Sequence, residues 1–136
     1  EKSDEYYDLA LKMNPMDAYV LNNYSYYLSL RGENLEKAGE MAKRANDIEP
    51  NSPSFMDTYG WVLYKLGDYE SAAEWVKKAL DHPEEDGAVL LEHYGDILYK
   101  LNRKEEALDY WQKAKDTGQE ASEFLDKKIS EQKLYE

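Results

Sequence analysis

The chain contains no cysteine among its 136 residues. This absence excludes disulfide bridges, thiolate metal sites and a cysteine nucleophile. It does not choose a compartment, because a reducing cytosol and an exported protein that needs no bridges both agree with it. Long apolar runs are missing as well: Ala88–Leu91 is four residues long, whereas a membrane-spanning helix needs about 18 apolar residues. The sequence therefore predicts no membrane span.

Basic side chains are scarce. Lysine and arginine total 17 against 29 acidic residues, which gives a formal net charge of −12. Such a chain repels a phosphate backbone, and no basic stripe with interleaved aromatic residues is present. The composition therefore argues against a nucleic-acid partner.

Groups that commonly carry catalysis are few. There are two histidines: His82 precedes Pro83 in a predicted turn, and His93 lies near Glu92 and Asp96 on a predicted helix. Two or three scattered ligands do not define a metal geometry, so neither a metal nor a cofactor is predicted. The sequence also lacks a glycine-rich phosphate loop and a serine in a nucleophile-elbow motif. We expect a chain that is not an enzyme.

What the sequence does contain is a repeat with a period of 35 residues. Each copy has a tyrosine, then a small residue and, three positions later, a leucine; the copies are Leu21–Leu28, Met56–Leu63 and Leu91–Leu98. Each is followed by an alanine, a bulky residue and a second alanine seven positions after the first, at 38–45, 72–79 and 107–114. At these offsets the apolar positions share one helical face. Each repeat is therefore predicted to be a helical hairpin.

Small residues lie inside the predicted first helices, at Ser25, Gly60 and Gly95. Glycine inside a helix costs up to about 1 kcal/mol relative to alanine. Because the alanines of the second helix face the same seam, we infer that the two helices approach closely there. Trp75 and Trp111 lie beside that seam and are predicted to belong to the core.

These residues resemble the tetratricopeptide repeat (TPR) family. Its pattern is W-x2-L-G-x2-Y, then an alanine, an aromatic residue, a second alanine and a terminal proline. The best match comprises Tyr59-Gly60, Gly67-Asp68-Tyr69, Ala72, Ala79 and Pro83. The resemblance covers residues 3–118, although Leu63 and Leu98 replace the second aromatic residue of the pattern. It implies an all-α, right-handed superhelix of about three helical hairpins.

We interpret the chain as a single solenoid over residues 1–136. Its predicted parts are a half repeat at 1–16, repeats at 17–52, 53–86 and 87–118, and a capping helix within 119–136 that covers repeat three. Because the chain opens inside a half repeat, we expect it to be part of a longer protein. The tyrosine-rich sequence and the ending at 128–136 resemble the last repeats of exported bacterial TPR proteins, many of them lipoproteins. This narrower resemblance implies a periplasmic or outer-membrane location, while composition leaves the cytoplasm open.

Local signals predict the starts of several helices. Asp17 and Ser52 are suited to cap the first helices of repeats one and two, and Asp86 that of repeat three. Asn102-x-x-Glu105 resembles a capping box for the last paired helix. The predicted helices span about 3–13, 17–30, 35–48, 53–66, 69–80, 86–101, 102–117 and 119–133.

In the TPR family the first helices line a concave groove that binds peptides. The resemblance implies such a face here, where rigid aromatic rings bury area at little entropic cost and amides can pair with a peptide backbone. Its residues are Tyr19, Asn22, Asn23, Tyr26 and Leu30 in repeat one, Asp57, Trp61, Tyr64 and Lys65 in repeat two, and Glu92, His93, Asp96, Tyr99 and Lys100 in repeat three. The alternative is that these are ordinary solvated positions, and for Trp61 that its ring packs inside the protein.

The expected partner is an unknown protein or peptide. Asn23, Lys65 and Lys100 match in type the residues with which TPR co-chaperones hold the acidic C-termini of heat-shock chaperones. Asn22 and Tyr26, however, stand where that motif has a lysine and an asparagine, and acidic first-helix residues oppose an acidic ligand. A basic or neutral partner is therefore expected.

Taken together, these features favour a non-enzymatic protein-interaction scaffold that binds a peptide or partner protein in its concave groove. Two alternatives stay open: a substrate-positioning appendage of a larger enzyme, and a structural module that self-associates through exposed repeat ends.

Overall fold

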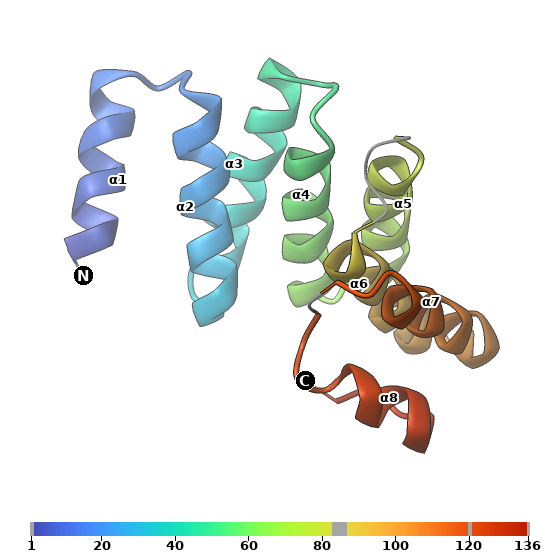
Figure 1. Ribbon diagram of the computed structural model, residues 1–136. Helices are drawn as coiled ribbons and strands as arrows, with labels where there is room; N and C mark the ends of the chain where they lie inside the picture. The colour runs from blue at the N-terminus through green and yellow to red at the C-terminus, as the bar shows by residue number, and fades with distance from the viewer. Residues whose placement is uncertain (1, 83–86, 120, 136) are drawn as a thin grey trace.

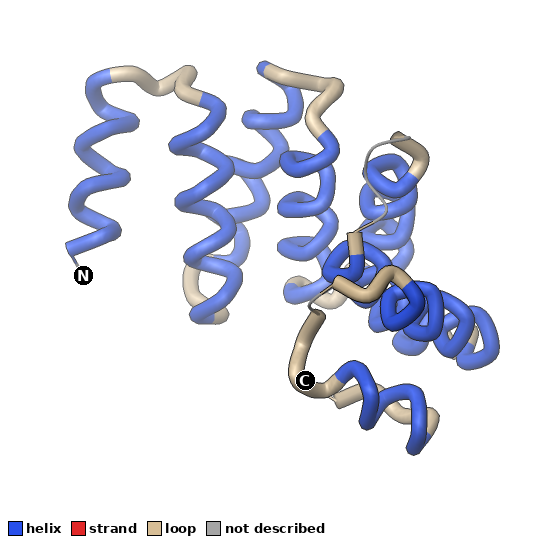
Figure 2. Tube along the Cα trace, in the orientation of Figure 1, coloured by secondary structure: helices blue, strands red, loops and turns tan. Residues whose placement is uncertain are grey.

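The computed structural model describes residues 2–82, 87–119 and 121–135, and over these ranges the chain forms eight α-helices and no strand (Figures 1 and 2). Their bounds are α1 Lys2–Met13, α2 Ala18–Arg31, α3 Leu35–Ile48, α4 Pro53–Lys65, α5 Tyr69–Leu80, α6 Ala88–Lys100, α7 Lys104–Asp116 and α8 Leu125–Glu131. None of these helices is long and apolar enough to cross a membrane. The predicted all-α class is confirmed.

Consecutive helices pair into hairpins that stack in chain order. The pairs α2–α3, α4–α5 and α6–α7 are repeats one, two and three, and each first helix also packs on the second helix of the repeat before it. Helix α1 packs on α2, and α8 packs on α7. In Figure 1, α1 to α5 run roughly parallel, whereas α6 and α7 are seen closer to end-on, so the stack turns along its length. We call the side formed by α2, α4 and α6 the first-helix face.

Side-chain caps and left-handed residues set the helix ends. The carboxylate of Asp17 accepts a hydrogen bond from the amide of Val20, and the hydroxyl of Ser52 accepts one from the amide of Phe55, as predicted. Asp86, the third predicted cap, lies outside the described residues; Gly87 precedes α6.

The capping box predicted at Asn102-x-x-Glu105 is wrong. Arg103 is the residue before α7, and no side chain caps that helix. Asn102 instead adopts a left-handed conformation with φ of 64° after the end of α6, the conformation that Gly32 adopts after α2. Asparagine tolerates this region better than most residues, so Asn102 ends one helix and does not begin the next.

The glycines of the first helices allow the close approach that the sequence predicted. A Cβ atom added to Gly60 would lie 2.6 Å from Cγ2 of Val76, and one added to Gly95 would lie 2.5 Å from Cδ1 of Trp111. Trp111 is fully buried, which confirms its assignment to the core, whereas Trp75 is half-buried and packs edge-on against Tyr59. The two glycines therefore make room for side chains of the paired helix.

The C-terminal segment is helical over a shorter range than predicted. Helix α8 has seven residues, because the chain before it is held in another way: the amide of Ser122 donates to the carboxylate of Glu92 and the amide of Phe124 donates to the hydroxyl of Ser122. Leu125 is buried in the apolar cluster of repeat three, which contains Trp111. The segment thus covers the end of repeat three.

Candidate functional site

Aromatic stacking joins the first helices of repeats two and three. The ring of Trp61 on α4 stacks on the ring of His93 on α6, with centroids 4.2 Å apart and planes 16° from parallel. Tyr64 stacks on Trp61 with a centroid distance of 4.8 Å. Nδ1 of His93 is 3.1 Å from Oδ1 of Asp57, also on α4. One histidine therefore makes both an aromatic and a polar contact with the preceding repeat.

Three carboxylates act on the charge of His93. Burial works to lower the pKa of His93, but the carboxylates of Asp57, Asp96 and Glu92, of which Asp57 contributes most, together hold the pKa above its usual value. When protonated, His93 donates a hydrogen bond to Asp57, and the pair becomes an ion pair.

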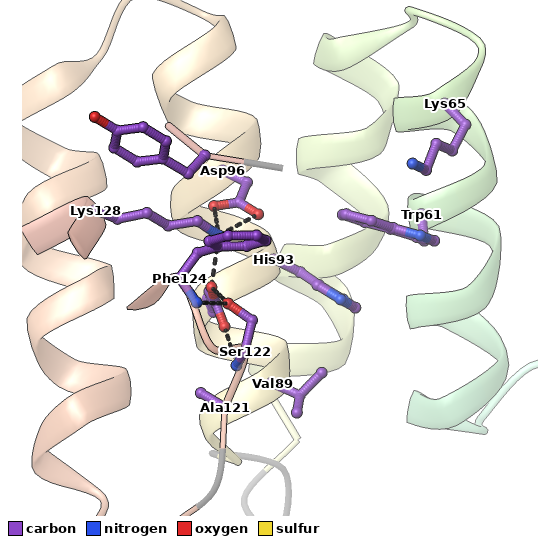
Figure 3. A pocket seen from close by; sticks show the side chains of 11 residues that line it. Trp61, Lys65, Val89, His93, Asp96, Ala121, Ser122, Phe124 and Lys128 are labelled. Atoms are coloured by element: carbon purple, nitrogen blue, oxygen red, sulfur yellow. Dashed lines mark hydrogen bonds and ion pairs between the residues drawn. The ribbon is translucent and has the colours of Figure 1, made fainter. Parts of the chain in front are cut away.

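A second polar cluster lies next to the first. Nζ of Lys128, from α8, is 2.5 Å from Oε2 of Glu92 and 2.9 Å from Oδ1 of Asp96, both on α6 (Figure 3). These three residues are only 2–4% exposed. The hydroxyl of Ser122 donates to Glu92, and the indole Nε1 of Trp111 donates to Asp96 over 3.0 Å. Every charge in the cluster is therefore hydrogen-bonded, as buried charges must be.

The two carboxylates differ in their affinity for protons. Burial works to raise the pKa of Glu92, but hydrogen bonds from Lys128 and Ser122 outweigh it and hold the pKa below its usual value. Burial dominates at Asp96 and raises its pKa to about 6 despite the nearby Lys128. Glu92 is thus the stronger acid of the two, and Asp96, with its pKa of about 6, is the carboxylate that takes up a proton first as pH falls.

The two clusters are copies of one arrangement in successive repeats. Glu92 lies 35 residues after Asp57, and Lys128 lies 35 residues after His93, so acid and cation keep the period of the sequence. In both cases the acid pairs with a basic side chain 36 residues later. We call these two pairs the ion ladder. At the same positions repeat one has Asn22 and repeat two has Thr58, both buried and uncharged.

A pocket of about 410 Å³ opens beside the ladder on the first-helix face. Figure 3 shows Trp61 and Lys65 on one side of it and the C-terminal segment with Lys128 on the other. Its lining residues are Trp61, Lys65, Val89, Glu92, His93, Asp96, Ala121, Ser122, Phe124, Lys128 and Tyr135. The pocket therefore combines aromatic walls with a charged, hydrogen-bonded base.

Five of the fourteen candidate site residues line this pocket: Trp61, Lys65, Glu92, His93 and Asp96. The candidates of repeat one do not line it: Asn22 is buried, and the others are exposed elsewhere, namely Tyr19, Asn23, Tyr26 and Leu30. Asp57 and Lys100 also lie outside the lining.

The remaining two aromatic candidates pack against the protein itself. Tyr64 is 4% exposed, between Trp61 and Tyr69. Tyr99 is half-buried and stacks on Trp111, with centroids 5.8 Å apart. Both rings contribute to packing, and Trp61 is the aromatic candidate that borders the pocket. The binding role of the candidate residues stays a prediction.

Sequence reasoning missed the contribution of the C-terminal segment. Ser122, Phe124, Lys128 and Tyr135 line the pocket, although the capping segment was assigned only a covering role. The spacing between His93 and Lys128 was the signal, because it continues the 35-residue period beyond repeat three. Among the residues that the structure describes, no three or more histidine, aspartate or glutamate side chains are grouped as metal ligands.

The comparisons agree with this repeat geometry. A family model described as "Anaphase-promoting complex, cyclosome, subunit 3" matches residues 32–114, more than half of the chain. The chain belongs to this TPR-type family. A search of curated proteins finds no match.

Solved TPR structures share the fold at low sequence identity. YrrB, a TPR protein, is 24% identical with a TM-score of 0.70 over 93% of this chain and 60% of that chain. PilF of Pseudomonas aeruginosa is 24% identical with a TM-score of 0.71, over 86% of this chain and 53% of that one. The Sgt2 TPR domain of Aspergillus fumigatus is 16% identical with a TM-score of 0.74, over 85% and 76%. The predicted TPR superhelix is confirmed, and the chain spans less than two thirds of YrrB and PilF.

Proposed function

We propose that this chain is a non-enzymatic protein-interaction module that binds a segment of a partner protein on its first-helix face. The observation that carries the proposal is the open pocket between α4, α6 and the C-terminal segment, with Trp61 at its edge. The printed title for YrrB, "a TPR protein with an unusual peptide-binding site", gives general support, since that protein has the same fold.

The pocket suits one large side chain of a bound segment. Its volume of about 410 Å³ falls in the range of sites that bury small ligands. Trp61 and Phe124 offer aromatic surface, and Val89 at the rim is half exposed. An apolar or aromatic anchor side chain would bury its area here, whereas the rest of the segment would lie along the exposed parts of α4 and α6.

The charges favour a basic or neutral segment over an acidic one. The chain carries a net charge of −12, whereas the pocket lining is close to balanced, with the carboxylates of Glu92 and Asp96 against the ammonium groups of Lys65 and Lys128. The repulsion of an acidic segment therefore comes from the net charge of the whole chain and not from the lining of the pocket. Because part of this preference acts at long range, salt should weaken it.

Calorimetry with matched peptides tests the proposal. Three ten-residue peptides carry the same leucine and tyrosine anchors and differ only in having four lysines, four glutamines or four glutamates. The lysine and glutamine peptides should bind the wild-type chain more tightly than the glutamate peptide. Trp61→Ala should weaken binding by about 2 kcal/mol or more, the scale of interface hot spots.

Trp75→Ala is the matched control, because Trp75 lies on α5 and outside the pocket. It should leave peptide affinity unchanged, and melting curves should show that both variants fold. Tighter binding of the glutamate peptide, or an equal loss of affinity in the two tryptophan variants, would refute binding at this face.

A further inference from the structure

The first-helix face of repeat three already holds a peptide-like ligand, namely the chain's own C-terminal segment. The amide and hydroxyl of Ser122 donate to Glu92, Leu125 enters the apolar cluster of repeat three, and the ammonium group of Lys128 lies between Glu92 and Asp96. The three contacts recur at intervals of three residues. They define which groups a segment must present to be held here.

The receptor for these groups is built by repeat three alone. Glu92 and Asp96 are four residues apart and therefore lie on one side of α6. Trp111 of α7 orients Asp96 through its indole N–H. The carboxylates thus keep their geometry through the α6–α7 hairpin, whichever segment supplies the ammonium group.

The occupant, in contrast, has little helical stability of its own. Helix α8 has seven residues and no side-chain hydrogen bond at its N-cap, and helices this short are not stable on their own in water. Its attachment comprises Leu125 with the partly buried Ile129 and Leu134, the ion pair of Asp126 with Lys115, and the buried ammonium group of Lys128. Such a segment can leave when another one offers the same contacts.

We propose that residues 121–135 are an intramolecular ligand that a lysine-bearing partner segment replaces, with the partner's ammonium group taking the place of Lys128 between Glu92 and Asp96. The preferred partner has a serine or threonine, an apolar residue three positions later and a lysine six positions later, as in Ser122, Leu125 and Lys128. The inference rests on the proposed function for the partner, but the ammonium site can be tested without one.

The first experiment removes the lysine and returns its missing part as a small molecule. In the Lys128→Ala chain, n-propylammonium replaces the portion of the side chain that alanine lacks. Its binding should raise the melting temperature by about 3–6 °C when its concentration is about ten times its dissociation constant. n-Propanol, which has no charge, and tetramethylammonium, which has no N–H donor, should raise it far less.

Three controls locate the effect. The wild-type chain and Lys127→Ala, which loses an exposed neighbouring lysine, keep the site filled and should not respond. Lys128→Ala combined with Glu92→Gln and Asp96→Asn has no carboxylates and should not respond either. A specific rise in Lys128→Ala supports the ammonium site; equal responses in all chains, or none in a folded Lys128→Ala, overturn it.

The second experiment supplies the whole segment in trans. A synthetic peptide with the sequence of residues 121–135 and its copy with glutamine in place of Lys128 are added to the ¹⁵N-labelled Lys128→Ala chain. The indole N–H signal of Trp111 reports occupancy, because that group donates to Asp96. The lysine peptide should bind at least about tenfold more tightly than the glutamine peptide, and more tightly to Lys128→Ala than to the wild-type chain, where it must compete.

The outcomes separate this inference from the proposed function. If Lys128→Ala does not fold, the same two 121–135 peptides are added to the wild-type chain. A shift of the Trp111 signal with the peptide that keeps Lys128, and no shift with its glutamine copy, supports replacement. Identical effects of the two peptides overturn it. If n-propylammonium rescues Lys128→Ala while the ten-residue peptides fail to bind, the ammonium site stands and the proposed function falls. If the ten-residue peptides bind in a way that depends on Trp61, but n-propylammonium does not stabilise Lys128→Ala, the proposed function stands and the ammonium site is overturned.

Discussion

Adding one methyl group at Gly95 should destabilise the protein, although alanine is the better helix former. The new Cβ would lie 2.5 Å from Cδ1 of Trp111 and 3.1 Å from the carbonyl oxygen of Ala107. Carbon atoms in favourable contact are about 3.5–4.0 Å apart, so the ring would have to move by roughly 1 Å. Trp111 is fully buried and bound to Asp96, so it has little room to move.

The magnitude follows from two opposing effects. Replacing glycine by alanine inside a helix contributes up to about 1 kcal/mol of stability. Overpacking a core costs about 1–3 kcal/mol, and weakening a hydrogen bond to a charged group costs about 1.5–3 kcal/mol. We therefore expect Gly95→Ala to lower the free energy of unfolding by about 2 kcal/mol.

Gly39→Ala is the matched control. Gly39 also lies inside a helix, α3, but a Cβ there would meet Cδ1 of Leu66 at 3.6 Å, an ordinary contact. This variant should be more stable than wild type by up to about 1 kcal/mol. Urea unfolding followed by circular dichroism measures both. If the two substitutions shift the midpoint in the same direction, the close-approach argument for Gly95 is wrong.

Three further perturbations address the C-terminal segment. Lys128→Met leaves two buried carboxylates without their cation and should cost about 3–5 kcal/mol, whereas Lys127→Met, at an exposed position, should change stability by less than about 0.5 kcal/mol in the same urea assay. Leu125→Ala should cost about 2 kcal/mol or more; an unchanged urea midpoint would show that this leucine does not anchor α8. The free energy of unfolding should rise as pH falls from 8 to 5.5, because the pKa values of His93 and Asp96 are raised in the folded chain. Asp96→Asn should lose the part of that rise near pH 6. The free energy of unfolding, measured by urea titration at several pH values, would contradict the Asp96 assignment if it changed equally with pH in the wild-type and Asp96→Asn chains.

The helices could be predicted from the sequence because the capping residues, the apolar pattern and the 35-residue repeat all indicate the same helix positions. The second helices at 35–48 and 69–80 coincide with α3 and α5. The period of 35 residues, the caps at Asp17 and Ser52 and the alanine seam all require the same hairpins. Asn102 was misread because asparagine serves both ends of a helix, and only the backbone conformation distinguishes the two roles.

The site was less predictable, because the resemblance to TPR proteins indicates where a residue lies on a first helix but not which residue its side chain contacts. Glu92 and Asp96 occupy groove positions, yet they are buried by Lys128. Tyr64 occupies one as well and packs beneath Trp61. Long-range pairings of this kind depend on where the segment after repeat three returns. The apolar and capping patterns do not encode that return, and the one signal for it is the spacing of 35 residues between His93 and Lys128.

The ion ladder also gives the solenoid a direction of unfolding. A stack of repeats behaves as a chain of neighbours whose interfaces set the order in which the units open. On one side of α6, His93 forms an ion pair with Asp57 when it is protonated, and on the other side Lys128 forms ion pairs with Glu92 and Asp96. The interface between α2 and α4 has the uncharged Asn22 and Thr58 at the same positions. Fraying should therefore start at the N-terminal hairpin and stop before α6. Amide hydrogens of α2 and α3 should then exchange with solvent sooner than those of α6 and α7, so the hairpin that carries Glu92 and Asp96 stays folded longest.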